Sequence, residues 1–256
     1  MHAFARATSL SALSIRCGVC GCGSLLAHIH IPEQGISMSE ERKHKVGIMG
    51  GTFDPIHIGH LILGEAARQQ FRLDKVLFMP AGNPPHKRNR AGRATDEQRV
   101  EMVRLAIASN PGFELSLFEM NEDGYSYTYR TLEMLREENP DTEFYFIMGA
   151  DSLFDFDQWR DPQRIVNAAH IVVATRNQTD PDVFDALLNQ RREQFHGDFL
   201  KLDTPNLDIS SKHIRERIRN RESARYYLPD PVLEYIREKG IYLDPGETRE
   251  TASCSG

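Results

Sequence analysis

The chain has 256 residues, of which 40% are hydrophobic and 27% charged, and its formal net charge at pH 7 is -6. These values are ordinary for a globular chain that forms one large α/β domain or two small ones. The acidic balance argues against a broad nucleic-acid surface, which normally carries a basic excess. No run approaches the roughly 18 apolar residues needed to span a bilayer. We therefore expect neither nucleic acid nor a membrane as a partner.

Residues 1–44 are interpreted as a disordered or non-native N-terminal extension. Residues 1–37 contain no acidic residue before Glu33, which is also compatible with a transit or signal sequence, but their apolar stretches are short and broken. Translation that begins at Met38 is the simpler explanation. The tail at 244–256 is likewise expected to be disordered.

Three of the four cysteines, Cys17, Cys20 and Cys22, lie together in this extension. With His28 or His30 they would make a zinc site, although the segment has no helix or strand period to hold one. No framework of paired cysteines spans the rest of the chain, which fits a reducing, cytoplasmic location.

From Lys45 onward, predicted strands alternate with predicted helices. The strands are expected at Val46–Met49, Val76–Pro80, Phe113–Phe118, Phe144–Met148, His170–Ala174 and Phe199–Leu202. The helices are expected at 58–71, 96–109, 127–138, 182–195, 210–220 and 230–238. Continuously apolar strands suit a parallel sheet that is covered on both faces. The alternation predicts one α/β domain over 45–243, a doubly wound, Rossmann-like parallel sheet with helices on both faces and ligands at the carboxyl ends of the strands.

A glycine turn joins the first strand to the first helix over residues 50–60, GGTFDPIHIGH. In a strand, turn and helix of this kind, backbone N–H groups and the positive end of the helix face a bound phosphate. His57 and His60 fall about one turn apart on the same side of the helix, so they could bind a polyphosphate together. The alternative is a tight turn that carries two surface histidines. Asp54 is interpreted as a turn residue.

Three later loops follow the carboxyl ends of strands, at 80–90, 148–159 and 207–215, and should converge with the first turn on one crevice. Ser210 is a natural N-cap for the helix that follows it. Arg215, one turn into that helix, would complete a second anion site. The alternative there is an ordinary capped, basic surface helix. Lys87 either neutralises phosphates or is a solvated loop lysine.

These motifs, in this order, resemble the nucleotidylyltransferase superfamily and, within it, the bacterial nicotinate-nucleotide adenylyltransferases. The resemblance covers about residues 45–243. It rests on H-x-G-H at 57–60, Pro-Pro-His-Lys at 84–87, Ser-Tyr-Thr at 126–128, Gly149-x-Asp151, Trp159 with Arg160, and the run ISSKHIR at 209–215. Lys212 stands where the last signature usually has Thr, and the stretch 176–198 matches no motif.

The resemblance implies transfer of AMP from ATP to nicotinic acid mononucleotide by direct in-line attack, which forms deamido-NAD and pyrophosphate in NAD biosynthesis. It implies Mg²⁺ as the cofactor and no metal site made by the protein. The implied catalytic residues are His57, His60, Lys87 and Arg215. The implied ATP-binding residues are Gly50, Gly51, Thr52, Phe53, His57, His60, Gly149, Asp151, Ile209, Ser210 and Arg215. The implied acceptor-binding residues are Lys87, Thr128 and Trp159.

Three alternatives stay open at this point. The acceptor could be nicotinamide mononucleotide, or phosphopantetheine in the shorter enzymes of the superfamily. A non-catalytic nucleotide sensor could use the same pocket. The choice between a monomer and a homo-oligomer cannot be derived from the sequence.

Overall fold

The computed structural model describes residues 43–82, 92–120, 126–175, 180–205 and 207–243. The chain divides into two units, Met1–Glu40 and Glu41–Gly256, and every described residue belongs to the second. No helix among the described residues is long and apolar enough to cross a membrane.

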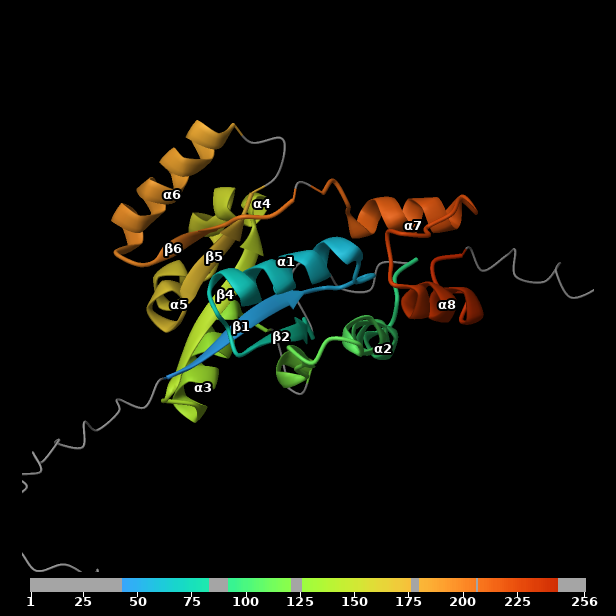
Figure 1. Ribbon diagram of the computed structural model, residues 1–256, viewed down its shortest axis with the longest axis horizontal. Coiled ribbons are helices and arrows are strands. Elements are labelled where there is room, and N and C mark those ends of the chain that lie inside the picture. The colour runs from blue at the N-terminus through green and yellow to red at the C-terminus, as the bar shows by residue number, and fades with distance from the viewer. Residues whose placement is uncertain (1–42, 83–91, 121–125, 176–179, 206, 244–256) are drawn as a thin grey trace, which may run out of the picture. The chain divides into compact units, whose positions relative to one another are not determined.

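Six parallel strands form one sheet in the order β3-β2-β1-β4-β5-β6 (Figure 1). The strands are β1 (His44–Gly51), β2 (Lys75–Pro80), β3 (Phe113–Leu115), β4 (Thr142–Gly149), β5 (His170–Ala174) and β6 (Phe199–Leu202). From β1 the chain winds outward to β2 and β3, and it then returns to the other side of β1 to form β4, β5 and β6. The order therefore reverses between β1 and β4, and in open α/β sheets this switch point is where ligands bind.

Helices connect successive strands and follow the last one. They are α1 (Ile58–Gln70), α2 (Asp96–Ile107), α3 (Thr128–Glu138), α4 (Ala150–Phe154), α5 (Pro162–Ala168), α6 (Pro181–Phe195), α7 (Ser211–Arg219) and α8 (Asp230–Glu238), with 3₁₀ turns η1 (Phe118–Met120) and η2 (Phe156–Gln158). Local chemistry explains several helix starts. Thr95 and Gln98 form a reciprocal capping box at α2, and Ser210 accepts a hydrogen bond from the His213 N–H at α7 over 3.2 Å.

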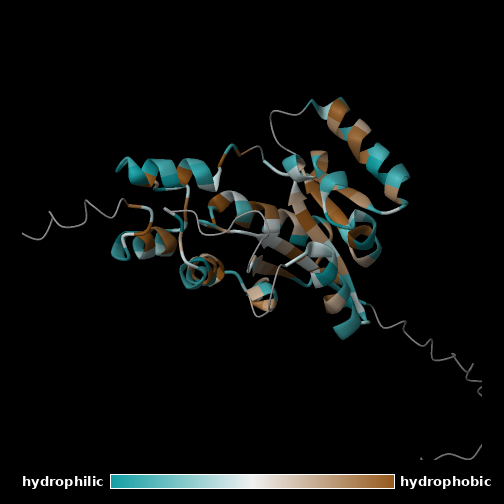
Figure 2. Ribbon diagram, turned by 180° about the vertical axis from the view of Figure 1, so that it is seen from behind, coloured by the Kyte–Doolittle hydropathy of each residue, from teal (hydrophilic) through white to brown (hydrophobic). Residues whose placement is uncertain are grey.

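Successive side chains along the strands point to opposite faces of the sheet and belong to two separate hydrophobic clusters. Tyr145 and Ile147 of β4 pack with α1, α2, α7 and α8, whereas Phe144 and Phe146 pack with α3, α4, α5 and α6. Figure 1 accordingly shows α2, α7 and α8 gathered at one end of the molecule. In Figure 2 the strands range from nearly white to brown, and most helices carry a brown side and a teal side. Helices therefore cover both faces of the sheet, as the sequence predicts.

The predicted elements agree with the observed ones except in two places. The third strand ends at Leu115, and the predicted end at Phe118 instead begins the turn η1. The segment between β4 and β5 forms α4, η2 and α5, none of which the sequence pattern predicts. These three elements have five, three and seven residues. Elements so short carry too little periodicity to be recognised, and isolated short helices are marginal without tertiary contacts.

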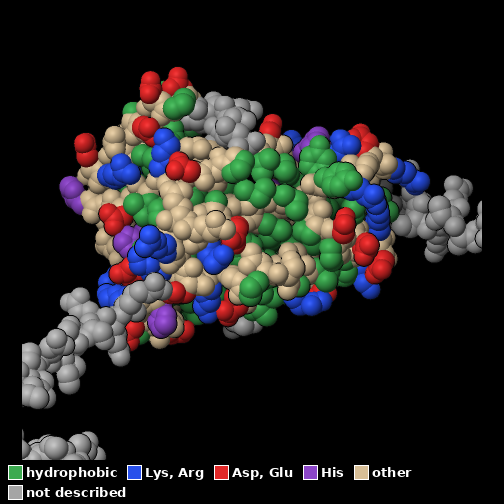
Figure 3. Space-filling model, in the orientation of Figure 1, with side chains coloured by type: hydrophobic (Ala, Val, Ile, Leu, Met, Phe, Trp, Pro, Cys, Tyr) green, Lys and Arg blue, Asp and Glu red, His purple; other side chains and the backbone are tan. Residues whose placement is uncertain are grey.

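The face that carries α1 and α7 mixes both signs of charge. In Figure 3 the described Lys and Arg side chains are interspersed with Asp and Glu, and apolar side chains lie between them. On this face they do not gather into the continuous basic stripe that a nucleic-acid surface would normally carry.

Candidate active site

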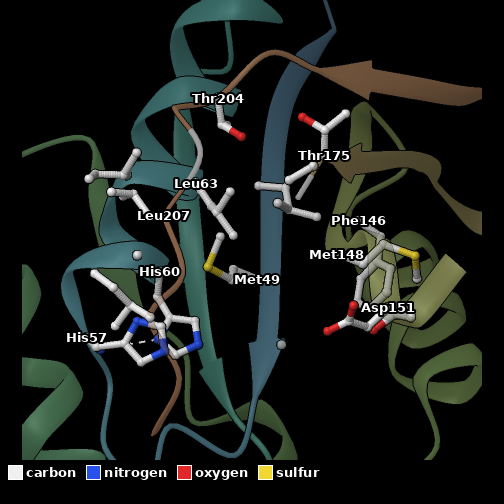
Figure 4. Close-up of a pocket in the computed structure, with 18 of the residues that line it drawn as sticks. Met49, His57, His60, Leu63, Phe146, Met148, Asp151, Thr175, Thr204 and Leu207 are labelled. Atoms are coloured by element: carbon white, nitrogen blue, oxygen red, sulfur yellow. Dashed lines mark hydrogen bonds between the residues drawn. The ribbon is translucent and has the colours of Figure 1, made fainter. Parts of the chain in front are cut away.

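A pocket lies at the switch point of the sheet, at the carboxyl ends of β1 and β4 (Figure 4). Gly50 at the end of β1 and Gly149 at the end of β4 both line it. Its two sides are called here the histidine wall (residues 57–60) and the tryptophan wall (residues 149–159). Figure 4 shows His57 and His60 on one side of β1 and Asp151 on the other.

The histidine wall consists of two imidazole rings stacked on each other. The ring centroids of His57 and His60 are 3.7 Å apart with an interplanar angle of 22°. Gly59 lets the His57 ring fold over the helix start, because a Cβ at this position would lie only 3.1 Å from Nδ1 of His57. A larger residue at this position would push the imidazole ring by a few tenths of an ångström, so the G in H-x-G-H favours the observed ring position.

A backbone hydrogen bond determines the tautomer of His60. The N–H of His57 donates to Nδ1 of His60 over 3.2 Å, so Nδ1 supplies a lone pair. The proton of the neutral ring must then be on Nε2, which makes Nε2–H a hydrogen-bond donor. His60 is therefore oriented as a donor rather than as a general base.

The floor of the pocket between the two walls is apolar. Met49 of β1, Leu63 of α1 and Phe146 of β4 contribute to it. Thr175 and Thr204, which follow β5 and β6, also line it, and both lie toward the same end of the pocket in Figure 4. An apolar slot with a few polar groups at its ends is the usual form of a small-molecule site, and a flat heterocyclic ring fits it.

The tryptophan wall combines an acidic and an aromatic side chain. Asp151 is exposed in the first turn of α4, and Trp159 is half-buried after η2; both line the pocket. Trp159 packs on Phe146 and Phe156 at centroid distances of 6.1 and 5.6 Å. Around Gly149, no described atom other than those of its chain neighbours lies within 4 Å of where a Cβ would sit, so a ligand can approach this backbone closely.

Asp54 lies in the turn between β1 and α1, as expected, and its side chain is also a buried junction behind the histidine wall. Its side chain is only 2% exposed. Its Oδ1 accepts hydrogen bonds from the N–H of Ala94 (3.1 Å) and from the hydroxyl of Tyr242 (2.8 Å). Its Oδ2 lies 3.4 Å from Nη1 of Arg93 and 3.8 Å from Nη1 of Arg215. A carboxylate buried this deeply needs such partners.

The Tyr242 hydroxyl is held in its neutral form. Burial, and then the adjacent Asp54 carboxylate, raise the pKa of Tyr242 well above its usual value. The phenol therefore keeps its proton and donates a hydrogen bond to Asp54. This contact joins a residue close to the end of the described chain to the turn after β1.

Arg99 of α2 joins the two loops that follow β1 and β2. Its guanidinium, 5% exposed, donates to the carbonyls of Thr52 and Ala81, each over 2.8 Å, and to Oδ1 of Asp96 over 2.7 Å. The loop from Ala81 leads into the Pro-Pro-His-Lys segment. Arg99 thus holds Ala81 in place relative to Thr52.

The comparisons with known proteins agree with this geometry. Residues 48–217 match the family described as cytidylyltransferase-like. A probable nicotinate-nucleotide adenylyltransferase of Lachnoclostridium phytofermentans is 42% identical over 199 residues, which cover 78% of this chain and 99% of the relative. Another, from Synechococcus sp. (strain JA-3-3Ab), is 42% identical over 212 residues, 82% of this chain and 100% of the relative.

The chain belongs to the nicotinate-nucleotide adenylyltransferase family. A solved structure shares the fold at a TM-score of 0.65 and 20% identity, over 78% of this chain and 97% of its own. It is the nicotinic acid mononucleotide adenylyltransferase of Plasmodium falciparum, complexed with NaAD.

The pocket brings together about half of the site residues that the sequence of this family member predicts. The ones that line it are Gly50, His57, His60, Gly149, Asp151, Trp159 and Ile209. Lys87 lies outside the described residues. The motifs at 126–128 and 159–160 meet beside the pocket, where the guanidinium of Arg160 lies 5.9 Å from the ring centroid of Tyr127.

The other predicted residues within the described part of the chain are not among the residues that line the pocket. Gly51 is the last residue of β1, Thr52 follows it, and the Phe53 side chain is buried in the core. Thr128 is the first residue of α3. Ser210 caps α7, and Nη1 of Arg215 donates to the backbone carbonyl of Asp54 over 2.6 Å.

Sequence reasoning missed the charged side chains that support the walls from behind. Asp54 and Arg99 are buried, yet apart from Asp96, three residues before Arg99, the side-chain partners cited above are distant in sequence and the other partners are backbone groups. The signal that could have found Asp54 is its place inside a highly specific motif. Within the described residues, no group of three or more His, Cys, Asp or Glu side chains could hold a metal ion.

Proposed function

We propose that this chain transfers AMP from ATP to nicotinic acid mononucleotide and so forms deamido-NAD and pyrophosphate. The observation that carries the proposal is similarity along the whole length of relatives with that name, combined with a pocket in which the motif residues meet. The domain that performs this reaction is proposed to span 45–243. The cysteine pattern supports a cytoplasmic location.

The histidine wall is proposed to bind the triphosphate. His57 and His60 donate hydrogen bonds to the phosphates and stabilise the charge that builds up as pyrophosphate leaves. Lys87, Ser210 and Arg215 are proposed to neutralise and hold the outer phosphates, and the backbone at residues 50–53 lets them approach. No general base is needed, because the phosphate that attacks is already ionised. Catalysis is then positioning and charge stabilisation, as in phosphoryl transfer generally.

The tryptophan wall is proposed to bind the sugar and the acceptor. The Asp151 carboxylate accepts hydrogen bonds from ribose hydroxyls of ATP, with the Gly149 backbone beside it. The indole of Trp159 offers an aromatic surface on which a pyridine ring can stack. Thr128 and Lys87 are proposed to contact the mononucleotide at its carboxylate and phosphate.

Mg²⁺ fits this site as an ion that ATP brings with it. Mg²⁺ usually keeps several waters and binds substrate phosphates with at most one or two carboxylates, so it does not need a cluster of protein ligands. Asp151 is the acidic side chain among the residues that line the pocket. Bound there, the ion would neutralise charge on the phosphates.

The proposal is tested by measuring pyrophosphate release with ATP and Mg²⁺ while the acid and amide mononucleotides are offered in parallel. We expect release with the acid mononucleotide and a clearly higher kcat/KM than with the amide. Equal rates, or a preference for the amide, would overturn the acceptor assignment. If neither mononucleotide supports pyrophosphate release, the proposed activity is refuted altogether.

A further inference from the structure

Arg191 is a buried cation in α6, within the stretch 176–198 that matches no sequence motif. Its side chain is 6% exposed. A charge this deeply buried costs free energy unless it is paired and hydrogen-bonded. Nη1 donates to Oε1 of Gln194 over 2.7 Å, which is a contact within the same helix. The other contacts of Arg191 reach a different part of the molecule.

Nη2 of Arg191 contacts the tryptophan wall at two points. It lies 3.3 Å from Oδ1 of Asp157 and 3.4 Å from the carbonyl oxygen of Phe154. Phe154 is the last residue of α4, and Asp157 lies in η2, two residues before Trp159. One guanidinium therefore holds the segment that connects Asp151 to Trp159.

Phe156, between these two points, transmits the placement of this segment to Trp159. It is fully buried and lies between the indole and α6. Its ring centroid is 5.6 Å from that of Trp159 and 5.5 Å from that of Phe195 at the end of α6. The indole is thus positioned from behind by α6, through an ion pair and a row of aromatic rings.

We propose that Arg191 is a positioning residue that sets the placement of Trp159 and thereby the affinity for the aromatic ring of the acceptor. The proposal rests on the proposed function, since stacking of the acceptor on Trp159 belongs to that function. Without Arg191, the Phe154 carbonyl and the Asp157 carboxylate lose a common partner, and the segment between them can shift. Stacking depends on ring geometry, so a shift of the indole weakens acceptor binding.

The contacts of Arg191 predict that its loss weakens the binding of one substrate, the acceptor. Outside α6, Arg191 contacts Phe154 and Asp157, at the end of α4 and in η2, and not the first turn of α4 that carries Asp151. The histidine wall, proposed to bind the triphosphate, is supported by Asp54 and Arg99. Loss of Arg191 should therefore raise the KM for the acceptor and leave the KM for ATP nearly unchanged. A general loss of stability would not separate the two substrates in this way.

The test uses three variants in the full chain. Arg191→Met removes the charge and roughly keeps the length, and Arg191→Lys keeps the charge but cannot reach both partners in the same geometry. Asp157→Asn breaks the ion pair from the side of Asp157, whose side chain is 45% exposed, so it carries little risk of misfolding. Arg192→Met is the matched control, because Arg192 lies on the same helix but binds Asn189 and the Phe199 carbonyl.

Steady-state pyrophosphate release gives the KM for each substrate, and fluorescence of Trp159, the single tryptophan of the chain, reports the position of the indole. For Arg191→Met we expect the acceptor KM to rise about threefold, part of the effect of losing the stacking interaction altogether, with little change in the KM for ATP. Arg191→Lys and Asp157→Asn should show the same pattern at smaller size. In all three variants the emission of Trp159 should shift, and in Arg192→Met it should not.

The inference fails if Trp159 emission and the acceptor KM are unchanged in Arg191→Lys and Asp157→Asn, whether or not Arg191→Met folds. It also fails if both KM values rise together. Failure of the proposed function looks different, because the wild-type protein would then release no pyrophosphate with the acid mononucleotide. In that case titration of wild type and variants with this mononucleotide, followed by Trp159 fluorescence, still decides: equal affinities would refute the role of Arg191.

Discussion

The histidine wall and the tryptophan wall face each other across the switch point, but they are supported by different kinds of interaction. Behind the histidine wall, the Asp54 carboxylate joins two arginines and a neutral tyrosine. Behind the tryptophan wall, aromatic rings pack on one another, and Arg191 adds an ion pair. The wall proposed to meet the charged triphosphate is held by charges, and the wall proposed to meet a flat ring is held by rings. Charge stabilisation and stacking can therefore be disturbed separately.

The largest effect should come from removing the charge at the centre of the first network. Asp54→Asn leaves Arg93 and Arg215 without a buried counter-charge, and we expect the free energy of unfolding to fall by about 3 kcal/mol. Urea denaturation measures the change. Glu222→Gln is the control, since the exposed Arg217–Glu222 pair is worth at most about 1 kcal/mol. An equal loss of unfolding free energy in the two variants would show that the buried contacts of Asp54 do not stabilise the fold more than an ordinary surface ion pair does.

The next largest effect is expected on kcat, from a change in the histidine wall. His60→Ala removes an oriented donor, and we expect kcat to fall roughly 10²-fold, or about 2.7 kcal/mol in the barrier. Steady-state assays of pyrophosphate release give kcat. His213→Ala, which removes an exposed histidine from α7, should leave the rate unchanged. Full activity in His60→Ala would remove the role assigned to this ring.

A smaller effect is expected from a change in the tryptophan wall. Trp159→Leu keeps an apolar side chain but removes the aromatic face, so the KM for the acceptor should rise roughly fivefold to tenfold. The KM for ATP should change little, because Trp159 is proposed to touch the acceptor alone. Parallel titration of both substrates checks the split. A matching rise in the KM for ATP would mean that Trp159 does not contact the acceptor alone.

The smallest effect concerns the tyrosine that donates to Asp54. Tyr242→Phe should cost about 1 kcal/mol at neutral pH, the value of one hydrogen bond. The pKa of Tyr242 is raised above its usual value of 10.0, so the unfolded chain releases this proton at lower pH than the folded one. The stabilisation is therefore fully present below pH 10 and is lost as the pH rises through the folded pKa. Urea denaturation at a series of pH values should show the two proteins converging above pH 10, and a constant difference would contradict the assignment.

The same two walls show how much of the molecule can be predicted from its sequence. The strands, the long helices and the histidine wall were predicted because their determinants are contiguous, such as apolar runs, the Thr95 and Ser210 caps and the H-x-G-H run. The role of Asp54 was not predicted, because Ala94 and Tyr242 are 40 and 188 residues away from it. The tryptophan wall was recognised through its family motif, while its short elements and its support by Arg191 depend on tertiary contacts that leave no local pattern.

The central claim is that two histidines stabilise a leaving pyrophosphate while the acceptor attacks ATP directly. The rival is a histidine that first takes the adenylyl group and then passes it on, which would make two displacements at the α-phosphorus. The decisive measurement uses ATP carrying sulfur on the α-phosphorus as a single stereoisomer, with the configuration of the dinucleotide product read by phosphorus NMR. Direct attack predicts inversion at phosphorus. Retention would contradict the account, because it requires an intermediate that the stacked pair His57 and His60 is not proposed to form.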